Sequence, residues 1–224
     1  MSTRTDVSCR RTAANGGIHP QDAGALRSWF DGKNTVLLAG PGLGESAAPV
    51  CNALLGKKAP WSAAVLDADA LNALAAGKIK GPLPDQTVIT PHPGEAARLL
   101  DCTVGEVQAD REAAARRLAG MYHCIAVLKG RGTLIATPGG EVYHNPTGSA
   151  GLAKGGSGDI LAGLLSGLLA AGLKQGRTAE DAAIAAVWLH GAAGDRCAKR
   201  LGMAAMLPHD IFADLGAIFA ELER

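Results

Sequence analysis

The sequence Asn145-Pro-Thr-Gly-Ser-Ala-Gly-Leu-Ala-Lys-Gly-Gly-Ser-Gly-Asp159 leads directly into the apolar run Ile160-Leu-Ala-Gly-Leu-Leu-Ser-Gly-Leu-Leu169. A glycine-rich loop that enters a helix presents unpaired backbone N–H groups at the positive end of the helix dipole, where phosphate binds well. Five glycines fall between Gly148 and Gly158, all upstream of Asp159. The pattern therefore predicts a phosphate-binding loop, in which Asp159 either caps the helix or acts as a base beside the bound anion.

Short apolar runs alternate with helical patterns along the rest of the chain. We expect strands at 35–39, 63–66, 87–89 and 124–128, and an antiparallel pair at 133–136 and 141–144. We expect helices at 44–55, after 67–72, from 94, and at 103–120, 158–171, 179–200 and 209–222. Nearly continuous apolar strands separated by helices predict an α/β fold, with a central, mostly parallel sheet and helices on both faces in three layers.

Unusual loops follow these strands, at residues 40–44, 67–72, 90–95, 129–132 and 145–158. Ligands of open α/β sheets bind beyond the carboxyl ends of the strands. Five such loops at one edge predict a single ligand site. We expect it to belong to one domain spanning residues 21–224, after a poorly defined tail at residues 1–20.

The composition argues against several classes of protein. A net charge of +1 and an aromatic content of 4% give no charged or stacking surface for nucleic acid. Five cysteines without C-x-x-C spacing indicate reduced thiols in a cytoplasmic protein rather than disulfides or a zinc site. No apolar run reaches membrane-spanning length, and the N-terminus lacks the apolar core of a secretory signal.

Several polar residues in these loops have both a structural and a functional interpretation. His92 lies between two prolines that hold its backbone rigid, and we prefer a ring oriented towards a ligand over a tight turn with a solvated histidine. Asp67 and Asp69 suit either local caps, which we prefer, or Mg2+ ligands. Lys129 can neutralise phosphate charge in a loop that is also a hairpin turn. His190 is predicted to be structural.

Six motifs occur in a fixed order: GPGLG (40–44), LDADALN (66–72), TPHPGE (90–95), VLKGRGT (127–133), NPTGSAGLAKGGSGD (145–159) and LHGAAGD (189–195). Together they resemble the ADP- or ATP-dependent NAD(P)H-hydrate dehydratase family, a branch of the ribokinase-like superfamily. The resemblance implies a lyase that returns hydrated (S)-NADHX or NADPHX to NADH or NADPH. It also implies ADP or ATP as co-substrate, release of AMP or ADP with phosphate, Mg2+, and a cytoplasmic homo-oligomer, a tetramer.

The resemblance also assigns the site residues. Asp159 is expected to be the catalytic base that takes the proton from the hydrate's hydroxyl as it is phosphorylated. The nucleotide, ADP or AMP, is expected at Lys129, Gly130, Arg131, Gly132, Thr133, Gly155, Gly156, Ser157 and Gly158. The hydrated dinucleotide is expected at Gly42, Gly44, His92 and Asp159. The amides of 155–158 are expected to stabilise the charge of the transferring phosphoryl group.

The N-terminal part of the sequence departs from the family pattern. Family members carry, well before GPGLG, another glycine-rich strand–loop–helix with an alanine that contacts the hydrate, and the 35 residues before Val36 contain no such segment. We expect a shortened reading frame, or a hydrate pocket that lacks a wall and leaves a sheet edge exposed. Two alternative functions stay open, namely a ribokinase-like small-molecule kinase and a non-catalytic nucleotide-binding remnant.

Overall fold

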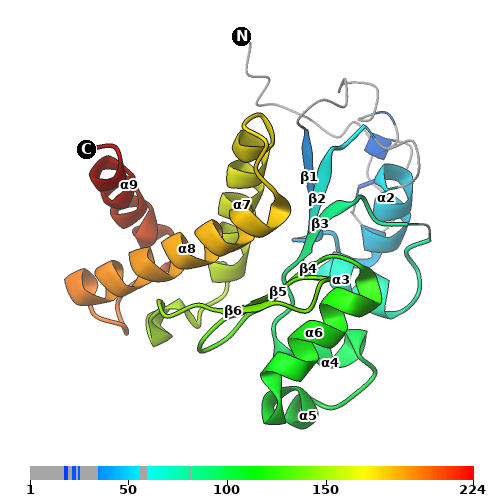
Figure 1. Cartoon of the computed structure of the whole chain (residues 1–224), viewed down its shortest axis with the longest axis horizontal. Coiled ribbons are helices and arrows are strands. Elements are labelled where there is room, and N and C mark those ends of the chain that lie inside the picture. Colours follow the sequence, from blue (N-terminus) through cyan, green and yellow to red (C-terminus); the bar gives the residue numbers. More distant parts are fainter. Residues whose placement is uncertain (1–17, 20–21, 24, 26–34, 56–59, 81) are drawn as a thin grey trace.

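A six-stranded sheet forms the centre of the part of the chain that the computed structural model describes, which is residues 18–19, 22–23, 25, 35–55, 60–80 and 82–224 (Figure 1). The strands are β1 (Val36–Ala39), β2 (Ala63–Leu66), β3 (Gln86–Ile89), β4 (Ile125–Leu128), β5 (Leu134–Ala136) and β6 (Val142–His144), and they lie in sequence order. β1 to β4 pair in parallel, whereas β4–β5 and β5–β6 are antiparallel.

The helices cover both faces of this sheet. The elements are η2 (Gly44–Ser46), α2 (Ala47–Leu54), α3 (Asp69–Ala75), α4 (Pro93–Leu99), α5 (Val104–Ala109), α6 (Arg111–Tyr122), η3 (Ala150–Leu152), α7 (Ser157–Leu173), α8 (Ala179–Leu201), η4 (Pro208–Asp210) and α9 (Ile211–Leu222). Parallel strands in sequence order need crossovers of one hand, so α2 to α6 fall on one face. α7 and α8 cover the other face, and α9 packs on α8 (Figure 1).

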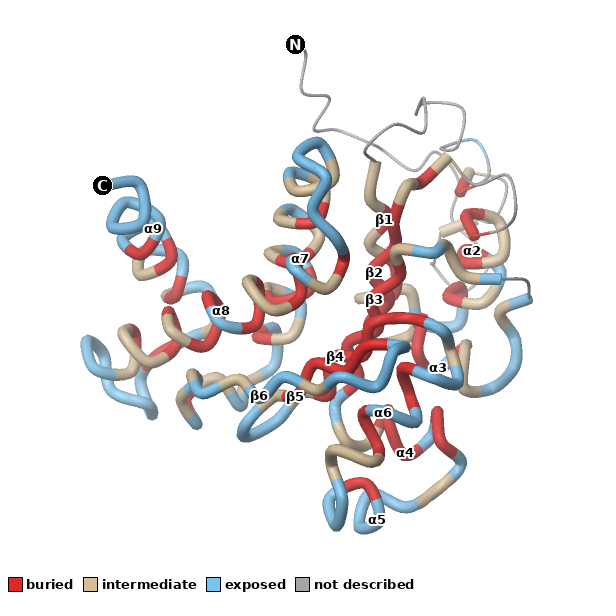
Figure 2. Tube along the Cα trace, in the orientation of Figure 1, coloured by how far each residue is buried: buried red, intermediate tan, exposed pale blue. Residues whose placement is uncertain are grey.

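Alternate residues of each strand belong to two different cores. Leu66, Ile89 and Leu128 pack with α2 to α6, while their neighbours Val65 and Val88 pack with α7 and α8. All four residues of β2 and of β4 are buried, so the centre of the sheet is covered from solvent on both faces (Figure 2). The predicted three-layer α/β fold is therefore confirmed.

The helix expected over 103–120 is two helices. Thr103 and Glu106 form the predicted capping box of α5. Asp110 then leaves helical geometry, with φ −142°, and its Oδ1 accepts a hydrogen bond of 2.9 Å from the Ala113 amide, which caps α6. Asp110, which was expected inside one helix, is thus the N-cap of a second helix.

The tail expected at residues 1–20 lies outside the described residues except for 18 and 19. Among the described helices, none combines the length and the apolar character that crossing a membrane requires.

Candidate active site

The loops that follow β1 to β4 meet at one edge of the sheet, as predicted. Each is tied to its neighbour by a backbone hydrogen bond: the Asp67 amide to Ala39 O at 3.1 Å, the Thr90 amide to Leu66 O at 3.1 Å, and the Lys129 amide to Pro91 O at 2.9 Å. These bonds continue the sheet ladder into the loops, so the positions of the loop side chains are set by the sheet.

The GPGLG loop lies against the loop that follows β2. Gly40 has φ +131°, and a Cβ at this position would lie 1.7 Å from Asp67 O, so only glycine fits. Next to it, the Gly44 amide donates a 2.8 Å hydrogen bond to Asp69 Oδ2. Asp69 therefore holds a loop, which supports its structural interpretation.

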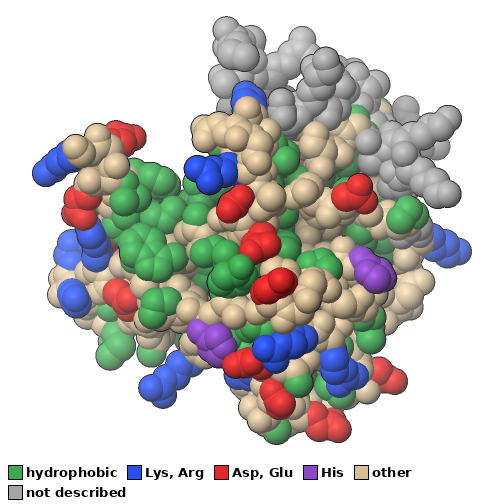
Figure 3. Space-filling model, in the orientation of Figure 1, with side chains coloured by type: hydrophobic (Ala, Val, Ile, Leu, Met, Phe, Trp, Pro, Cys, Tyr) green, Lys and Arg blue, Asp and Glu red, His purple; other side chains and the backbone are tan. Residues whose placement is uncertain are grey.

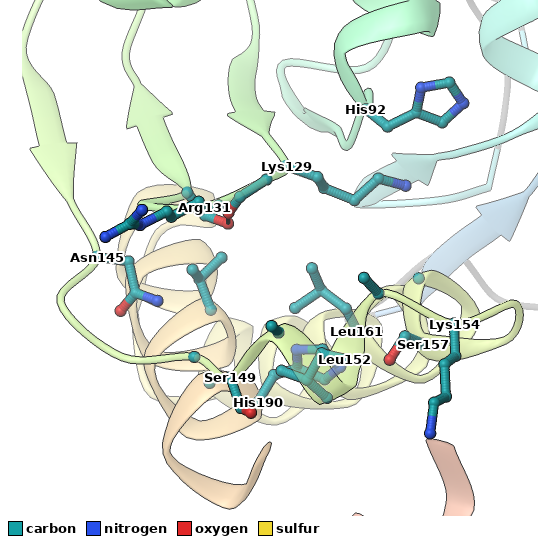
Figure 4. A pocket seen from close by; sticks show the side chains of 18 of the residues that line it. His92, Lys129, Arg131, Asn145, Ser149, Leu152, Lys154, Ser157, Leu161 and His190 are labelled. Carbon is teal, nitrogen blue, oxygen red and sulfur yellow. Dashed lines mark hydrogen bonds between the residues drawn. The ribbon is translucent and has the colours of Figure 1, made fainter. Parts of the chain in front are cut away.

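A cavity of about 830 Å3 opens at this edge, between the end of β4 and the glycine-rich loop before α7 (Figure 4). In Figure 4, Lys129 and Arg131 project from the strand side, and Ser149, Leu152, Ser157 and His190 lie on the opposite wall. The lining includes all nine residues expected to bind the nucleotide, and also His92 and Asp159. Gly42 and Gly44 are not part of it, so their contact with the hydrated dinucleotide stays a prediction.

The glycine-rich loop presents free amides at the N-terminus of α7. Gly156, with φ +95°, turns the chain into the helix. The Ser157 amide donates to Lys154 O at 3.2 Å, whereas the amides of Gly155, Gly156 and Gly158 donate to no described residue. The positive end of a 17-residue helix is thus open towards the cavity, as an anion site requires.

Asp159 is the third residue of α7, and its carboxylate does not cap the helix. The side chain is exposed and makes no hydrogen bond or ion pair with another described residue. It lines the nucleotide-sized cavity and also a second cavity of about 560 Å3 between α7 and α9, where hydrophobic side chains gather on the surface (Figure 3). Asp159 is therefore available as a base.

Lys129 lies between two buried carboxylates and the start of α7. Its Nζ is 2.8 Å from Asp67 Oδ1 and 3.9 Å from Glu95 Oε2, and those side chains are 2% and 7% exposed. A Cβ on Gly158 would lie 3.3 Å from the same Nζ. The ammonium therefore stands beside the helix N-terminus, where it adds positive charge next to the free amides.

His92 both caps a helix and faces the cavity. Its Nδ1 accepts hydrogen bonds from the amides of Gly94 at 3.0 Å and Glu95 at 3.4 Å, and Glu95 Oε2 accepts from the His92 amide at 2.8 Å. A neutral ring that accepts at Nδ1 carries its proton on Nε2. That Nε2 lies 3.5 Å from Glu95 Oε1, so the half-exposed ring packs against the start of its own helix, as in a tight turn. Its orientation towards the hydrated dinucleotide stays a prediction.

The cavity wall also contains Lys154, which the sequence did not single out, and His190, which it predicted to be structural. Lys154 Nζ donates to the carbonyls of Met203 at 3.1 Å, Ala204 at 2.9 Å and Met206, which fastens the glycine-rich loop to the segment after α8. His190 is 8% exposed, and its Nε2 has no partner among the described residues. Burial lowers the pKa of His190 to about 4, so the ring is neutral near pH 7.

The described residues contain no cluster of three or more His, Cys, Asp or Glu side chains that could hold a metal ion. The segment before GPGLG, on which the expectation of a missing hydrate wall rests, falls largely on residues outside the described ranges.

The chain is similar to proteins of one family. The family described as NAD(P)H-hydrate dehydratase matches residues 18–216. A bifunctional NAD(P)H-hydrate repair enzyme Nnr of Moorella thermoacetica is 44% identical over 197 residues, which is 84% of this chain and 35% of the relative. An ADP-dependent (S)-NAD(P)H-hydrate dehydratase of Neisseria meningitidis is 49% identical over 146 residues, 64% of this chain and 48% of the relative.

Solved structures show the same likeness. An ADP/ATP-dependent NAD(P)H-hydrate dehydratase of Bacillus subtilis, co-crystallized with ATP/Mg2+ and soaked with CoA, matches with a TM-score of 0.71 and 33% identity, over 83% of this chain and 66% of that one. A ribokinase-like superfamily protein of Enterococcus faecalis matches with a TM-score of 0.73 and 29% identity, over 90% and 68%. The fold is thus ribokinase-like.

The chain spans about a third to a half of the length of these curated relatives. Because the family match extends over residues 18–216, the chain belongs to the NAD(P)H-hydrate dehydratase family.

Proposed function

We propose that the chain is an ADP-dependent (S)-NAD(P)H-hydrate dehydratase, which converts hydrated NADH or NADPH and ADP into NADH or NADPH, AMP and phosphate. The observation that carries the proposal is the free carboxylate of Asp159 in the first turn of α7. It shares one cavity with the open amides of Gly155, Gly156 and Gly158 and with the Lys129 ammonium. A base, an anion site and a cation are the parts that phosphoryl transfer to an alcohol needs.

The reaction follows from these parts. Asp159 takes the proton of the hydrate's hydroxyl as that oxygen attacks the terminal phosphorus of ADP and the bond to AMP breaks. The amides at the start of α7, together with Lys129, stabilise the charge on the transferring phosphoryl group. Phosphate then leaves with the electron pair of the C–O bond, while the neighbouring carbon gives its proton to the departing phosphate and the ring regains its double bond. Hydroxide is a poor leaving group, so phosphorylation makes this elimination easy.

The residues present fit a magnesium ion that is carried by the phosphates. Mg2+ commonly keeps several waters and binds through one or two carboxylates plus substrate phosphates, so a protein cage is unnecessary. Asp67 and Asp159 are carboxylates of the cavity wall, and Asp67 Oδ2 would lie 3.8 Å from a Cβ on Gly158. We infer that Asp67 would hold the ion through water, and that the ion would neutralise phosphate charge, while Asp159 stays free to act as the base.

Assembly and location are part of the proposal. We infer a cytoplasmic homo-oligomer, a tetramer, from the family to which the chain belongs. The four described cysteines are free thiols, which suits a reducing compartment. Light scattering on the purified protein would measure the oligomer.

Replacement of Asp159 by asparagine tests the function. With hydrated NADH and ADP as substrates, recovery of the absorbance of reduced nicotinamide should slow by roughly 100- to 10,000-fold, because general-base catalysis contributes that much. AMP affinity should stay nearly unchanged, since the phosphate-binding amides are intact. The matched control is Asp181→Asn, which alters a first-turn aspartate of α8 outside the cavity wall. Near-normal turnover by Asp159→Asn would refute the role of Asp159 as the base. If the unchanged chain converts the hydrate into a stable phosphorylated compound, the protein is a kinase instead.

A further inference from the structure

Arg111 lies behind the loop between β4 and β5 and binds its main chain. It is the first residue of α6, and its Nη2 donates to Leu128 O at 3.2 Å, Lys129 O at 3.4 Å and Gly132 O at 3.4 Å. One guanidinium thus gathers three carbonyls, all from the segment that ends β4 and forms one wall of the cavity.

These contacts set the direction of the loop amides. The carbonyl of Lys129 and the amide of Gly130 belong to one planar trans peptide unit, so they point in opposite directions. Because Lys129 O points at Arg111, the Gly130 N–H points away from it. The amides of Gly130, Arg131 and Gly132 donate to no described residue, and all three residues line the cavity.

The positive charge of Arg111 is not cancelled locally. None of the ion pairs among the described residues involves Arg111, and its other side-chain contact is Gln108 Oε1 at 3.1 Å. The side chain is half-buried, and burial lowers the pKa of its guanidinium, although an arginine stays charged in proteins. The loop fits closely over it, since a Cβ on Gly130 would lie 3.1 Å from Nη1.

We infer that Arg111 is a positioning residue of the nucleotide site, which orients the Gly130 amide towards the ligand and adds positive charge behind the loop without touching the nucleotide. The inference rests on the proposed function, because that function supplies the nucleotide. Carbonyl-bound arginine also has a simple structural role in many proteins. A structural role alone would not change nucleotide affinity selectively, so measured affinities separate the two roles.

The test compares Arg111→Ala with Arg116→Ala. Arg116 is on the same helix and also donates to a carbonyl, Gly140 O at 3.1 Å, but it lies outside the cavity wall. In calorimetric titrations, Arg111→Ala should bind AMP roughly tenfold to 100-fold more weakly, because the Gly130 amide is no longer oriented towards the ligand and the positive charge behind the loop is lost. Turnover at saturating nucleotide should change little, so KM rises while kcat does not. Guanidinium ion at tens of millimolar should restore affinity to Arg111→Ala and do nothing for Arg116→Ala.

Hydrogen exchange of the ligand-free protein gives a second readout that needs no nucleotide. In Arg111→Ala, exchange should speed up at the Lys129 amide, which donates to Pro91 O at 2.9 Å at the start of the loop. It should remain unchanged in β2 and α8, and guanidinium should reverse the change. The inference would be overturned if Arg111→Ala binds AMP as tightly as the unchanged chain and its loop amides exchange at the same rate. It would also be overturned if hydrogen exchange in Arg111→Ala speeds up throughout the protein. If the unchanged chain binds no AMP, the proposed function fails. The role of Arg111 is overturned separately if guanidinium does not slow the faster exchange of the loop in Arg111→Ala.

Discussion

Replacing Lys129 with alanine should cost both stability and phosphate binding. The Lys129 ammonium is 2.8 Å from Asp67 Oδ1, and the Asp67 side chain is 2% exposed. Without the cation, a buried carboxylate is left unpaired, which should lower the free energy of unfolding by roughly 3–5 kcal/mol. The same change removes a charged hydrogen-bond donor beside the free amides of α7. ADP should therefore bind roughly tenfold to 100-fold more weakly, while adenosine, which has no phosphate, should bind almost as before.

A double variant separates the two losses. Lys129→Met with Asp67→Asn removes both charges of the 2.8 Å pair and leaves Glu95, 3.9 Å from Nζ, so urea unfolding should show part of the lost stability restored. Calorimetry on this variant should still show weak ADP binding and nearly normal adenosine binding. If ADP and adenosine weaken equally in the double variant, the phosphate contact of Lys129 is refuted. If Lys129→Ala alone unfolds at the same urea concentration as the unchanged chain, the buried pair is not what holds Asp67.

Two further predictions concern stability. The pKa of His190 is lowered from 6.5 to about 4 by burial, so between those pH values the unfolded chain binds the proton more readily. The contribution of neutral His190 to the free energy of unfolding should be fully present above pH 6.5 and fall by about 3 kcal/mol as the pH drops towards 4. In His190→Gln, the free energy of unfolding from urea titrations should depend less on pH over this range. Gly40→Ala should lower the free energy of unfolding by about 2–5 kcal/mol, because its Cβ would meet Asp67 O at 1.7 Å with φ +131°. Gly42 has φ +70°, and a Cβ there would have no atom within 4 Å, so Gly42→Ala should lower the free energy of unfolding by only about 1–2 kcal/mol. Equal losses for Gly40→Ala and Gly42→Ala in urea unfolding would contradict this reasoning.

Much of the fold is predictable from local pattern. β2 and β4 are buried on both faces, so their sequences are continuous apolar runs. A glycine-rich loop before an apolar helix likewise predicts free amides at a helix N-terminus from local sequence alone. The break at Asp110 is not predictable from the sequence, because an aspartate in a helical pattern does not by itself show a change of direction.

The residues that hold the loops from behind could not be predicted in the same way. Arg111 and Lys154 bind main-chain carbonyls, which every residue type possesses, so their partners leave no pattern in the sequence. The unpartnered Nε2 of His190 is likewise a property of packing, and the sequence predicted only that this residue is structural.

The placement of α7 has a consequence for how the protein is made. α7 packs on β1 and β2, which lie far earlier in the chain, and together with α8 it buries Val65, Val88 and Val127. A ribosome adds roughly 5–20 residues per second, so the stretch from the end of β4 to the end of α7 takes several seconds to synthesise. A sheet that forms from β1 to β4 during that time has its first layer of helices and a bare second face. We expect chaperones to bind the nascent chain at this stage, and aggregation to begin from this face when synthesis stalls before Leu173.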